Sequence, residues 1–283
     1  MKRFRKTGAA HGKFDGTRET SAPHMGELVF IGLGLHDEKG ISLRGLEEAR
    51  TCDELFAEFY TSTLPGASLA TLERTVGRRI RVLSRDEVER GEAILDASRI
   101  RRVGLLVVGD PMTATTHVDL RLRARAAGIP TRVIHGASIL TAASGALGLQ
   151  ASKFGRTTTV PTPAPGFEPA SPFEVILANF RAGLHTLVLL DLAEGGVPLS
   201  PQAALRQILS FAERAHAEEL GLDTLACVVS RAGAPEVRSS AGRIRDLLDR
   251  DLGPPLHAIV IPGDLHFLER EALTAFAGAR ADL

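Results

Sequence analysis

Residues 27–34 read ELVFIGLG, an almost continuous apolar run that ends in Gly-x-Gly. Continuous apolar character over this length is typical of a strand covered on both faces, as in a parallel sheet. Two glycines directly after such a strand favour either a tight turn or close approach of a ligand to the backbone. Asp37 stands where a dinucleotide-binding GxGxxG motif has its third glycine, so the sequence does not indicate an NAD site.

Short β-rich runs then alternate with longer helical patterns. The predicted strands span residues 54–60, 79–83, 103–109 and 131–135. The predicted helices span residues 42–52, 68–77, 85–99, 115–127 and 138–147. This alternation predicts βαβ units, and therefore an α/β fold with a mostly parallel sheet and helices on its faces.

A proline-rich stretch separates this part of the chain from the rest. Residues 156–172 contain five prolines, which remove backbone donors and interrupt regular helices and strands. After a predicted strand at 157–160 the alternation resumes. The later predicted strands span 185–192, 224–230 and 256–262, and the later predicted helices span 173–182, 201–220, 239–250 and 265–277. We therefore expect two α/β domains, residues 25–140 and 141–283, with a boundary between residues 136 and 150.

Composition excludes several classes of protein. The chain has 283 residues, with 34 Lys and Arg against 34 Asp and Glu, and this length is enough for two cored domains. Formal neutrality provides no overall field for holding nucleic acid. No apolar run reaches the roughly 18 residues of a membrane span. Cys52 and Cys227 lack CxxC spacing, so we expect two packed thiols in a reducing cytoplasm.

The first 24 residues differ from the remainder. They carry six of the basic and two of the acidic residues, which leaves 28 basic and 32 acidic residues in the other 259. They lack the apolar segment of a secretory signal. We expect residues 1–24 to be a basic, disordered leader or an over-extended reading frame, with the folded protein beginning near Met25. A nucleic-acid-binding arm is the sharper alternative.

Residues 109–117, GDPMTATTH, follow a predicted buried strand. In open α/β sheets, ligands bind outside the carboxyl ends of the strands. Asp110 stands at such an end, Pro111 stiffens the turn, and the threonines offer hydroxyl groups. We interpret Asp110 as part of a shaped binding loop, the alternative being a cap for the next helix. We expect His117 to be a neutral imidazole on the surface.

Two further regions also lie at the ends of predicted strands. Residues 135–139, HGASI, are small and follow a predicted strand, which favours close approach of a flat ligand. Leu190, Ala232 and His257 lie at other strand ends, where small and apolar groups suit an adenine-type pocket. The histidines form neither HxH nor HExxH and no EF-hand loop occurs, so we predict no metal site.

The order of several motifs resembles that of the diphthine synthase family in the tetrapyrrole-methylase superfamily. The GLGL and GDP motifs are shared across that superfamily, whereas AEFYTS, the ATTH extension and KFG are similar to the diphthine branch. The resemblance runs from about residue 27 to 278 and is carried by FIGLGL (30–35), GLEEARTCD (45–53), FAEFYTS (56–62), RVLSRDEVE (81–89), GDPMTATTH (109–117), VIHGASI (133–139), KFGRTTTV (153–160), GLHTLVLLDL (183–192), RAG (231–233) and PGDLHFLE (262–269). The leader and the proline-rich connection depart from the family pattern.

The resemblance implies a homodimeric two-domain methyltransferase that binds S-adenosylmethionine in the cleft between its domains. It also implies the acceptor, the amino group of a 3-carboxy-3-aminopropyl chain on a histidine of translation elongation factor 2. The archaeal-type product is trimethylated. The implied cofactor contacts are Leu35, Asp110, Thr113, Ser138, Ile139, Leu190, Ala232 and His257.

Methyl transfer to an amine needs alignment more than a nucleophilic side chain, so we assign no catalytic acid or base. Two other functions remain as alternatives. One is a corrin or tetrapyrrole-precursor methyltransferase of the same fold, and the other is a non-catalytic, nucleotide-binding dimeric protein. The organised loop at 109–117 argues against the second alternative.

Overall fold

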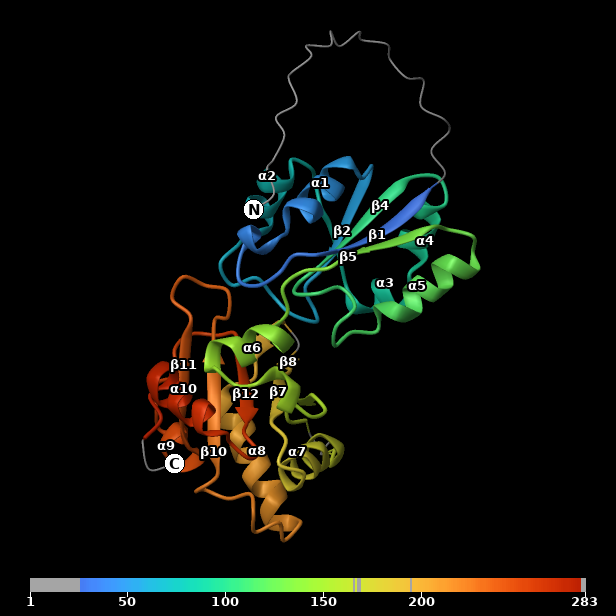
Figure 1. Ribbon diagram of the computed structural model, residues 1–283. Coiled ribbons are helices and arrows are strands. Elements are labelled where there is room, and N and C mark those ends of the chain that lie inside the picture. The colour runs from blue at the N-terminus through green and yellow to red at the C-terminus, as the bar shows by residue number, and fades with distance from the viewer. Residues whose placement is uncertain (1–25, 165, 167–168, 194, 281–283) are drawn as a thin grey trace, which may run out of the picture.

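The computed structural model describes residues 26–164, 166, 169–193 and 195–280 (Figure 1). Within these residues the chain forms two five-stranded sheets, one from residues 27–134 and one from residues 158–261. Figure 1 shows them as two lobes, each with helices around its sheet. The prediction of an α/β fold in two units is therefore confirmed, whereas the predicted leader at 1–24 lies outside the described residues.

The first sheet is entirely parallel, in the order β3-β2-β4-β1-β5. Its strands are β1 (Glu27–Gly32), β2 (Glu54–Glu58), β3 (Arg81–Leu83), β4 (Arg102–Val107) and β5 (Thr131–Ile134). Each matches a predicted strand to within a few residues. Because all five strands run the same way, their carboxyl ends lie along one edge of the sheet.

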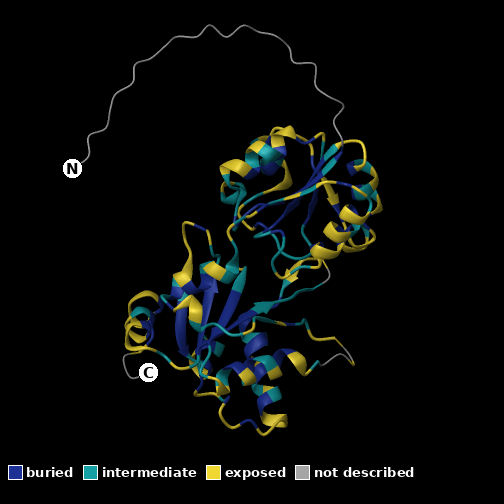
Figure 2. Ribbon diagram, turned by 45° about the vertical axis from the view of Figure 1, so that its right-hand side comes forward, coloured by how far each residue is buried: buried dark blue, intermediate teal, exposed yellow. Residues whose placement is uncertain are grey.

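Both faces of this sheet are covered, as the apolar run in β1 predicts. Val29 and Ile31 point into the core beneath α1 and α2, whereas Leu28 and Phe30 point into the core beneath α3, α4 and α5. The helices are η1 (Glu38–Gly40), α1 (Leu43–Thr51), α2 (Leu69–Val76), α3 (Arg85–Arg90), α4 (Glu92–Ser98) and α5 (His117–Ala126). In Figure 2 the central strands are mostly buried, and exposed residues lie largely on the helices and loops around them.

The second sheet has the order β11-β10-β12-β7-β6, and only the β6–β7 pair is parallel. Its strands are β6 (Thr158–Val160), β7 (Thr186–Leu190), β10 (Leu225–Ser230), β11 (Arg238–Arg243) and β12 (His257–Ile261). The prediction of a mostly parallel sheet is wrong for this lobe. Short connections such as the one from β10 to β11 can join only antiparallel neighbours.

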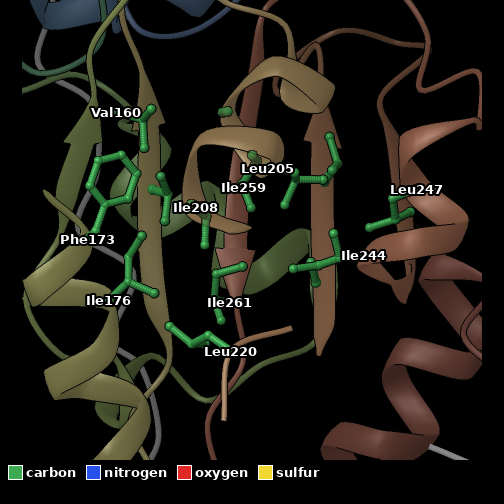
Figure 3. Packing of buried hydrophobic residues seen from close by; sticks show 14 of the residues in the cluster. Val160, Phe173, Ile176, Leu205, Ile208, Leu220, Ile244, Leu247, Ile259 and Ile261 are labelled. Carbon is green, nitrogen blue, oxygen red and sulfur yellow. The ribbon is translucent and has the colours of Figure 1, made fainter. Parts of the chain in front are cut away.

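Helices also cover both faces of the second sheet. Figure 3 shows one core, in which Ile259 and Ile261 of β12 pack with Phe173 of α7, Ile208 of α8 and Leu247 of α9. Ala258 and Val260 point to the opposite core, beneath α6 and α10. The helices are α6 (Ile139–Leu147), η2 (Ala151–Lys153), α7 (Ser171–Arg181), α8 (Pro201–Arg214), α9 (Ile244–Leu248) and α10 (Phe267–Ala277).

Three predicted elements differ from the structure. The helix predicted at 85–99 is two helices, because Gly91 adopts φ +70° and ends α3. The helix predicted at 201–220 ends at Arg214, and His216 then turns with φ +52°. The first part of the helix predicted at 239–250 is strand β11, since pairing with β10 overrides the weak helical pattern of its small residues, and only Ile244–Leu248 is helical, as α9. The short hairpin of β8 (Leu192–Ala193) and β9 (Val197–Pro198) was not predicted.

The domain boundary predicted at residue 140 stays a prediction. We propose a boundary slightly earlier, between β5 and α6, because Ala143 and Leu147 of α6 pack in the core of the second sheet. Cys52 and Cys227 are free, buried thiols, as predicted, and burial raises the pKa of Cys52 to about 11. Among the described residues, no helix has both the length and the apolar character to cross a bilayer.

A buried ion cluster joins the start of β7 to α10. The Glu269 carboxylate, in a residue that is 1% exposed, lies 2.6 Å from Lys153 Nζ and 3.0 Å from His185 Nε2. The Gly263 N–H donates to His185 Nδ1, so the ring carries its proton on Nε2, facing the carboxylate. Burial raises the pKa of Glu269, but hydrogen bonds from Lys153, from backbone N–H groups and from His185 outweigh burial and lower the pKa to about 2.

Replacing Glu269 should destabilise the protein strongly. Glu269→Ala leaves the buried His185 and the half-buried Lys153 without their carboxylate, and removing one partner of a buried ion pair typically costs about 3–5 kcal/mol. Thermal unfolding followed by circular dichroism measures the loss. Glu271→Ala, on the exposed face of the same helix, is the control and should stay within about 0.5 kcal/mol of the parent.

The same cluster predicts how stability depends on pH. Because the folded pKa of Glu269 is lowered from 4.5 to about 2, its contribution is complete above pH 4.5 and is lost as the pH falls toward 2. Burial lowers the pKa of His185 from 6.5, so its contribution is likewise lost on acidification below that value. Glu269→Ala should therefore lose less stability than the parent protein between pH 4.5 and 2. Parallel curves for the two proteins would contradict this assignment.

Candidate active site

A cavity of about 280 Å³ lies between the strand ends of the two sheets. Loops after β1, β2, β4 and β5 form its wall on the first lobe, and the ends of β7 and β10 with the start of β12 form its wall on the second. Enclosed pockets at the carboxyl ends of α/β strands are the usual position of ligand sites in such folds.

All eight residues predicted as cofactor contacts line this one cavity. They come from six segments that are far apart in the sequence: Leu35, Asp110, Thr113, Ser138, Ile139, Leu190, Ala232 and His257. The structure therefore brings every predicted position together. Their binding of a cofactor stays a prediction.

Close packing of main chain forms the floor of the site. Gly34 and Gly109 exchange two backbone hydrogen bonds, with N···O distances of 3.2 and 2.7 Å. A Cβ atom on Gly32 would lie 2.7 Å from Gly109 O, and one on Gly136 would lie 2.4 Å from the same oxygen. The turns after β1, β4 and β5 touch through backbone atoms, so only glycine fits at these contacts.

Asp110 organises the loop after β4. Its Oδ1 accepts hydrogen bonds from the Met112 N–H at 3.0 Å and the Thr113 hydroxyl at 3.2 Å, and its Oδ2 lies 2.6 Å from His135 Nδ1. Burial raises the pKa of Asp110, but these bonds outweigh burial and hold the pKa below its ordinary value. Helix α5 begins only at His117, so Asp110 shapes the loop rather than capping the helix. The carboxylate is ionised at neutral pH.

Three residues at the cavity hold a strained backbone. His36, Ala114 and Arg231 adopt φ values of 68°, 53° and 54°, a region that non-glycine residues rarely occupy. All three line the cavity. Strain of this kind persists only where surrounding structure enforces it, and it concentrates at functional sites.

A buried pair behind the cavity joins two of its loops. The Glu58 carboxylate accepts the N–H groups of Tyr60 and Thr61, both at 3.1 Å, and the Thr61 hydroxyl. His117 Nε2 lies 3.8 Å from Glu58 Oε1, and His117 Nδ1 lies 3.1 Å from Pro111 O. The expectation of a surface imidazole at His117 is wrong, since the residue is 1% exposed and lies between the loops after β2 and β4.

The second lobe contributes mainly small, apolar or neutral predicted contacts to the cavity wall. Leu190 and Ala232 present small or apolar groups, and His257 Nε2 lies 3.0 Å from Gly253 O. Burial lowers the pKa of His257 despite this hydrogen bond, so the ring is neutral at physiological pH. The part of this wall formed by Leu190, Ala232 and His257 is neutral and largely apolar, which suits a purine ring better than a metal ion.

Several lining residues were not predicted from the sequence. His36 and Arg231 each stand next to a predicted contact, and Tyr60, Thr61 and Arg85 belong to motifs used only to support the resemblance. Neither His36 nor Arg231 is a glycine, so the sequence does not indicate their positive φ values. Their positions next to Leu35 and Ala232 in the chain were the sequence signal that could have identified His36 and Arg231.

Comparison with known proteins gives the class that this fold and site define. Residues 27–248 match the family of Tetrapyrrole (Corrin/Porphyrin) Methylases. A crystal structure of a diphthine synthase superposes with a TM-score of 0.83 at 38% sequence identity, covering 90% of this chain and 98% of the other.

Two relatives narrow the class. The diphthine synthase of Methanothermobacter thermautotrophicus is 44% identical over 253 residues, which are 89% of this chain and 96% of the relative. That of Halorubrum lacusprofundi is 46% identical over 261 residues, 90% of this chain and 98% of the relative. The chain therefore belongs to the diphthine synthase family of tetrapyrrole methylases. It is a methyltransferase that uses S-adenosylmethionine.

The glycine packing predicts that an added methyl group at Gly136 disrupts the site. Gly136→Ala places a Cβ about 2.4 Å from Gly109 O, so the loops after β4 and β5 must separate. Overpacking of this kind typically costs about 1–3 kcal/mol. We expect a lower melting temperature and weaker binding of S-adenosylmethionine, measured by circular dichroism and calorimetry.

Gly145→Ala is the matched control in helix α6. A Cβ there would meet no heavy atom of the described residues within 4 Å beyond its own helical turn, and alanine favours the helix by about 1 kcal/mol. This variant should keep its stability and its binding. Equal effects of the two substitutions would contradict the proposed role of the close packing.

Proposed function

We propose that this chain methylates translation elongation factor 2 in diphthamide biosynthesis. The acceptor is the amino group of a 3-carboxy-3-aminopropyl chain already attached to a histidine of that factor. The convergence of eight predicted contacts from six segments of the chain on one cavity carries the proposal. The diphthine synthase relative that is 44% identical across 89% of the chain supports it.

We further propose that S-adenosylmethionine lies in the cleft between the lobes, held by the eight predicted contacts. The lining fits its parts. The ionised carboxylate of Asp110 attracts positive charge, and the Ser138 and Thr113 hydroxyls are available for polar groups. Leu190, with the neighbouring wall of the second lobe, suits the adenine.

The bound cofactor supplies an electrophilic methyl group on a sulfonium. The protein's contribution is alignment of the acceptor amine with that group, which is worth up to about 7–11 kcal/mol in favourable cases. The amine must be neutral to attack, and an α-amino group has a pKa of about 7.7–8.0. Burial in the cleft favours the neutral form. No side chain is required as a nucleophile, and we assign no acid or base.

Three finer points belong to the same proposal. The product carries three methyl groups, the protein is a homodimer, and it works in the cytoplasm. Mass spectrometry of the acceptor after exhaustive reaction counts the methyl groups. Light scattering of the purified protein gives the oligomeric state, and a monomer would remove that part of the proposal.

The acceptor assay tests the function directly. Purified protein with labelled S-adenosylmethionine should label elongation factor 2 that carries the carboxy-aminopropyl histidine. It should leave the unmodified factor unlabelled, since the methylated amine is absent there. Labelling of a tetrapyrrole precursor instead would assign the protein to corrin-type methylation, and cofactor binding without turnover on either acceptor would indicate a non-catalytic protein.

Asp110→Ala should weaken binding of S-adenosylmethionine by at least about 10-fold. Loss of a charged hydrogen-bonding group typically costs about 1.5–3 kcal/mol, and the loop loses its internal bonds to Met112 and Thr113. Isothermal titration calorimetry measures the dissociation constant. Asp119→Ala, an exposed carboxylate 2.9 Å from Arg123 on α5, is the control and should bind normally. An unchanged constant for Asp110→Ala would remove Asp110 from the site.

A further inference from the structure

His36 and Arg231 meet in the cavity from opposite lobes. His36 follows β1 and Arg231 follows β10, yet Arg231 Nη2 lies 3.4 Å from His36 Nε2. Both residues line the cavity and both hold a positive φ. Two residues with strained backbone therefore meet through their side chains, and such strain concentrates at functional sites.

The chemistry of the pair determines where its protons lie. A guanidinium only donates hydrogen bonds, so the Nε2 atom of His36 accepts from Arg231. The neutral imidazole must then carry its proton on Nδ1. Among the described residues, His36 Nδ1 and Arg231 Nε are buried and have no hydrogen-bond partner. The pair thus has two buried N–H donors without a partner and carries one positive charge, and it lacks an acceptor.

The other charged groups of the cavity do not supply that acceptor. Asp110 is bonded to Met112, Thr113 and His135, and Asp191 Oδ2 accepts the Thr162 N–H at 3.1 Å. In the described part of the chain, no carboxylate forms an ion pair with Arg231. Unsatisfied buried donors are costly, so an anionic ligand beside this pair would be stabilised. A planar carboxylate matches the donor fork of arginine.

We propose that Arg231, together with His36, binds the carboxylate of the acceptor's 3-carboxy-3-aminopropyl chain; this rests on the function proposed above. The carboxylate and the reacting amine are attached to the same carbon atom of that chain. Holding the carboxylate therefore fixes the amine two bonds away, and it does so again for each successive methyl transfer. Arg231 is on this account a positioning and specificity-determining residue.

The cofactor also has a carboxylate, and the position of the pair favours the acceptor. His36 packs against the loop after β2: the Gly66 N–H donates to His36 O at 2.9 Å, and a Cβ on Gly66 would lie 2.5 Å from His36 Nε2. This side of the cavity is lined by residues 60–63 and Pro65. None of residues 60–63 and Pro65 is among the eight predicted cofactor contacts.

Arg231→Gln tests the proposal with two forms of the acceptor. On elongation factor 2 bearing the carboxy-aminopropyl histidine, kcat/KM should fall about 10- to 100-fold, mainly through KM for the acceptor. The dissociation constant for S-adenosylmethionine should change less than about 3-fold. On a factor bearing an aminopropyl histidine without the carboxylate, the parent enzyme should already be slow, and the substitution should slow it no further.

Control variants separate this role from a structural one. Arg238→Gln, 3.6 Å from Asp251 at the far end of the same turn, should behave as the parent. Arg231→Lys keeps the charge and should recover part of the acceptor affinity, and His36→Asn, which tolerates positive φ, should lose less than Arg231→Gln. These two variants also test the pair if Arg231→Gln fails to fold.

Three results would overturn the inference. Weaker S-adenosylmethionine binding by Arg231→Gln, with an unchanged acceptor KM, would assign the carboxylate to the cofactor. Equal losses on both acceptors would remove carboxylate recognition. A parent enzyme inactive on the carboxylated factor would overturn the proposed function itself, and the inference with it.

Discussion

Backbone contact between three turns is the constraint on which the site depends. The turns after β1, β4 and β5 touch at Gly32, Gly109 and Gly136, and a Cβ added to Gly32 or Gly136 would lie 2.7 or 2.4 Å from Gly109 O. Since the main chain itself fills this space, the residues that follow each glycine are held in one place. Leu35, Asp110 and Ser138 reach the cavity from these turns.

The second lobe completes the site rather than merely covering it. Its turn at residues 231–233 comes against the loop after β1, where a Cβ on Gly233 would lie 2.7 Å from Leu35 Cβ. The same turn carries Arg231 to His36, and the neighbouring strand ends add Leu190 and His257. The cavity therefore has an apolar part and a part with unused donors, to which our proposals assign the cofactor and the anionic acceptor. The proposals place the two substrates side by side, as alignment of a methyl donor and an amine requires.

Much of this arrangement could be predicted from the sequence, for identifiable reasons. Buried parallel strands give continuous apolar runs, so β1 to β5 were visible, and loops after such strands marked the regions of Asp110 and Ser138. Strand β11 was missed because its pairing with β10 outweighs the local preferences of small residues. The buried position of His117 and the meeting of His36 with Arg231, 195 residues apart, depend on tertiary contacts that no local pattern encodes.

A crystal structure of the protein with S-adenosylhomocysteine and an acceptor fragment would test the account most directly. The fragment is a histidine carrying the 3-carboxy-3-aminopropyl chain. The account predicts the cofactor product against Asp110, Ser138 and Leu190, with the fragment's carboxylate on Arg231 and its amine facing the sulfur. Cofactor density outside this cavity, or a fragment carboxylate on another cation, would contradict it.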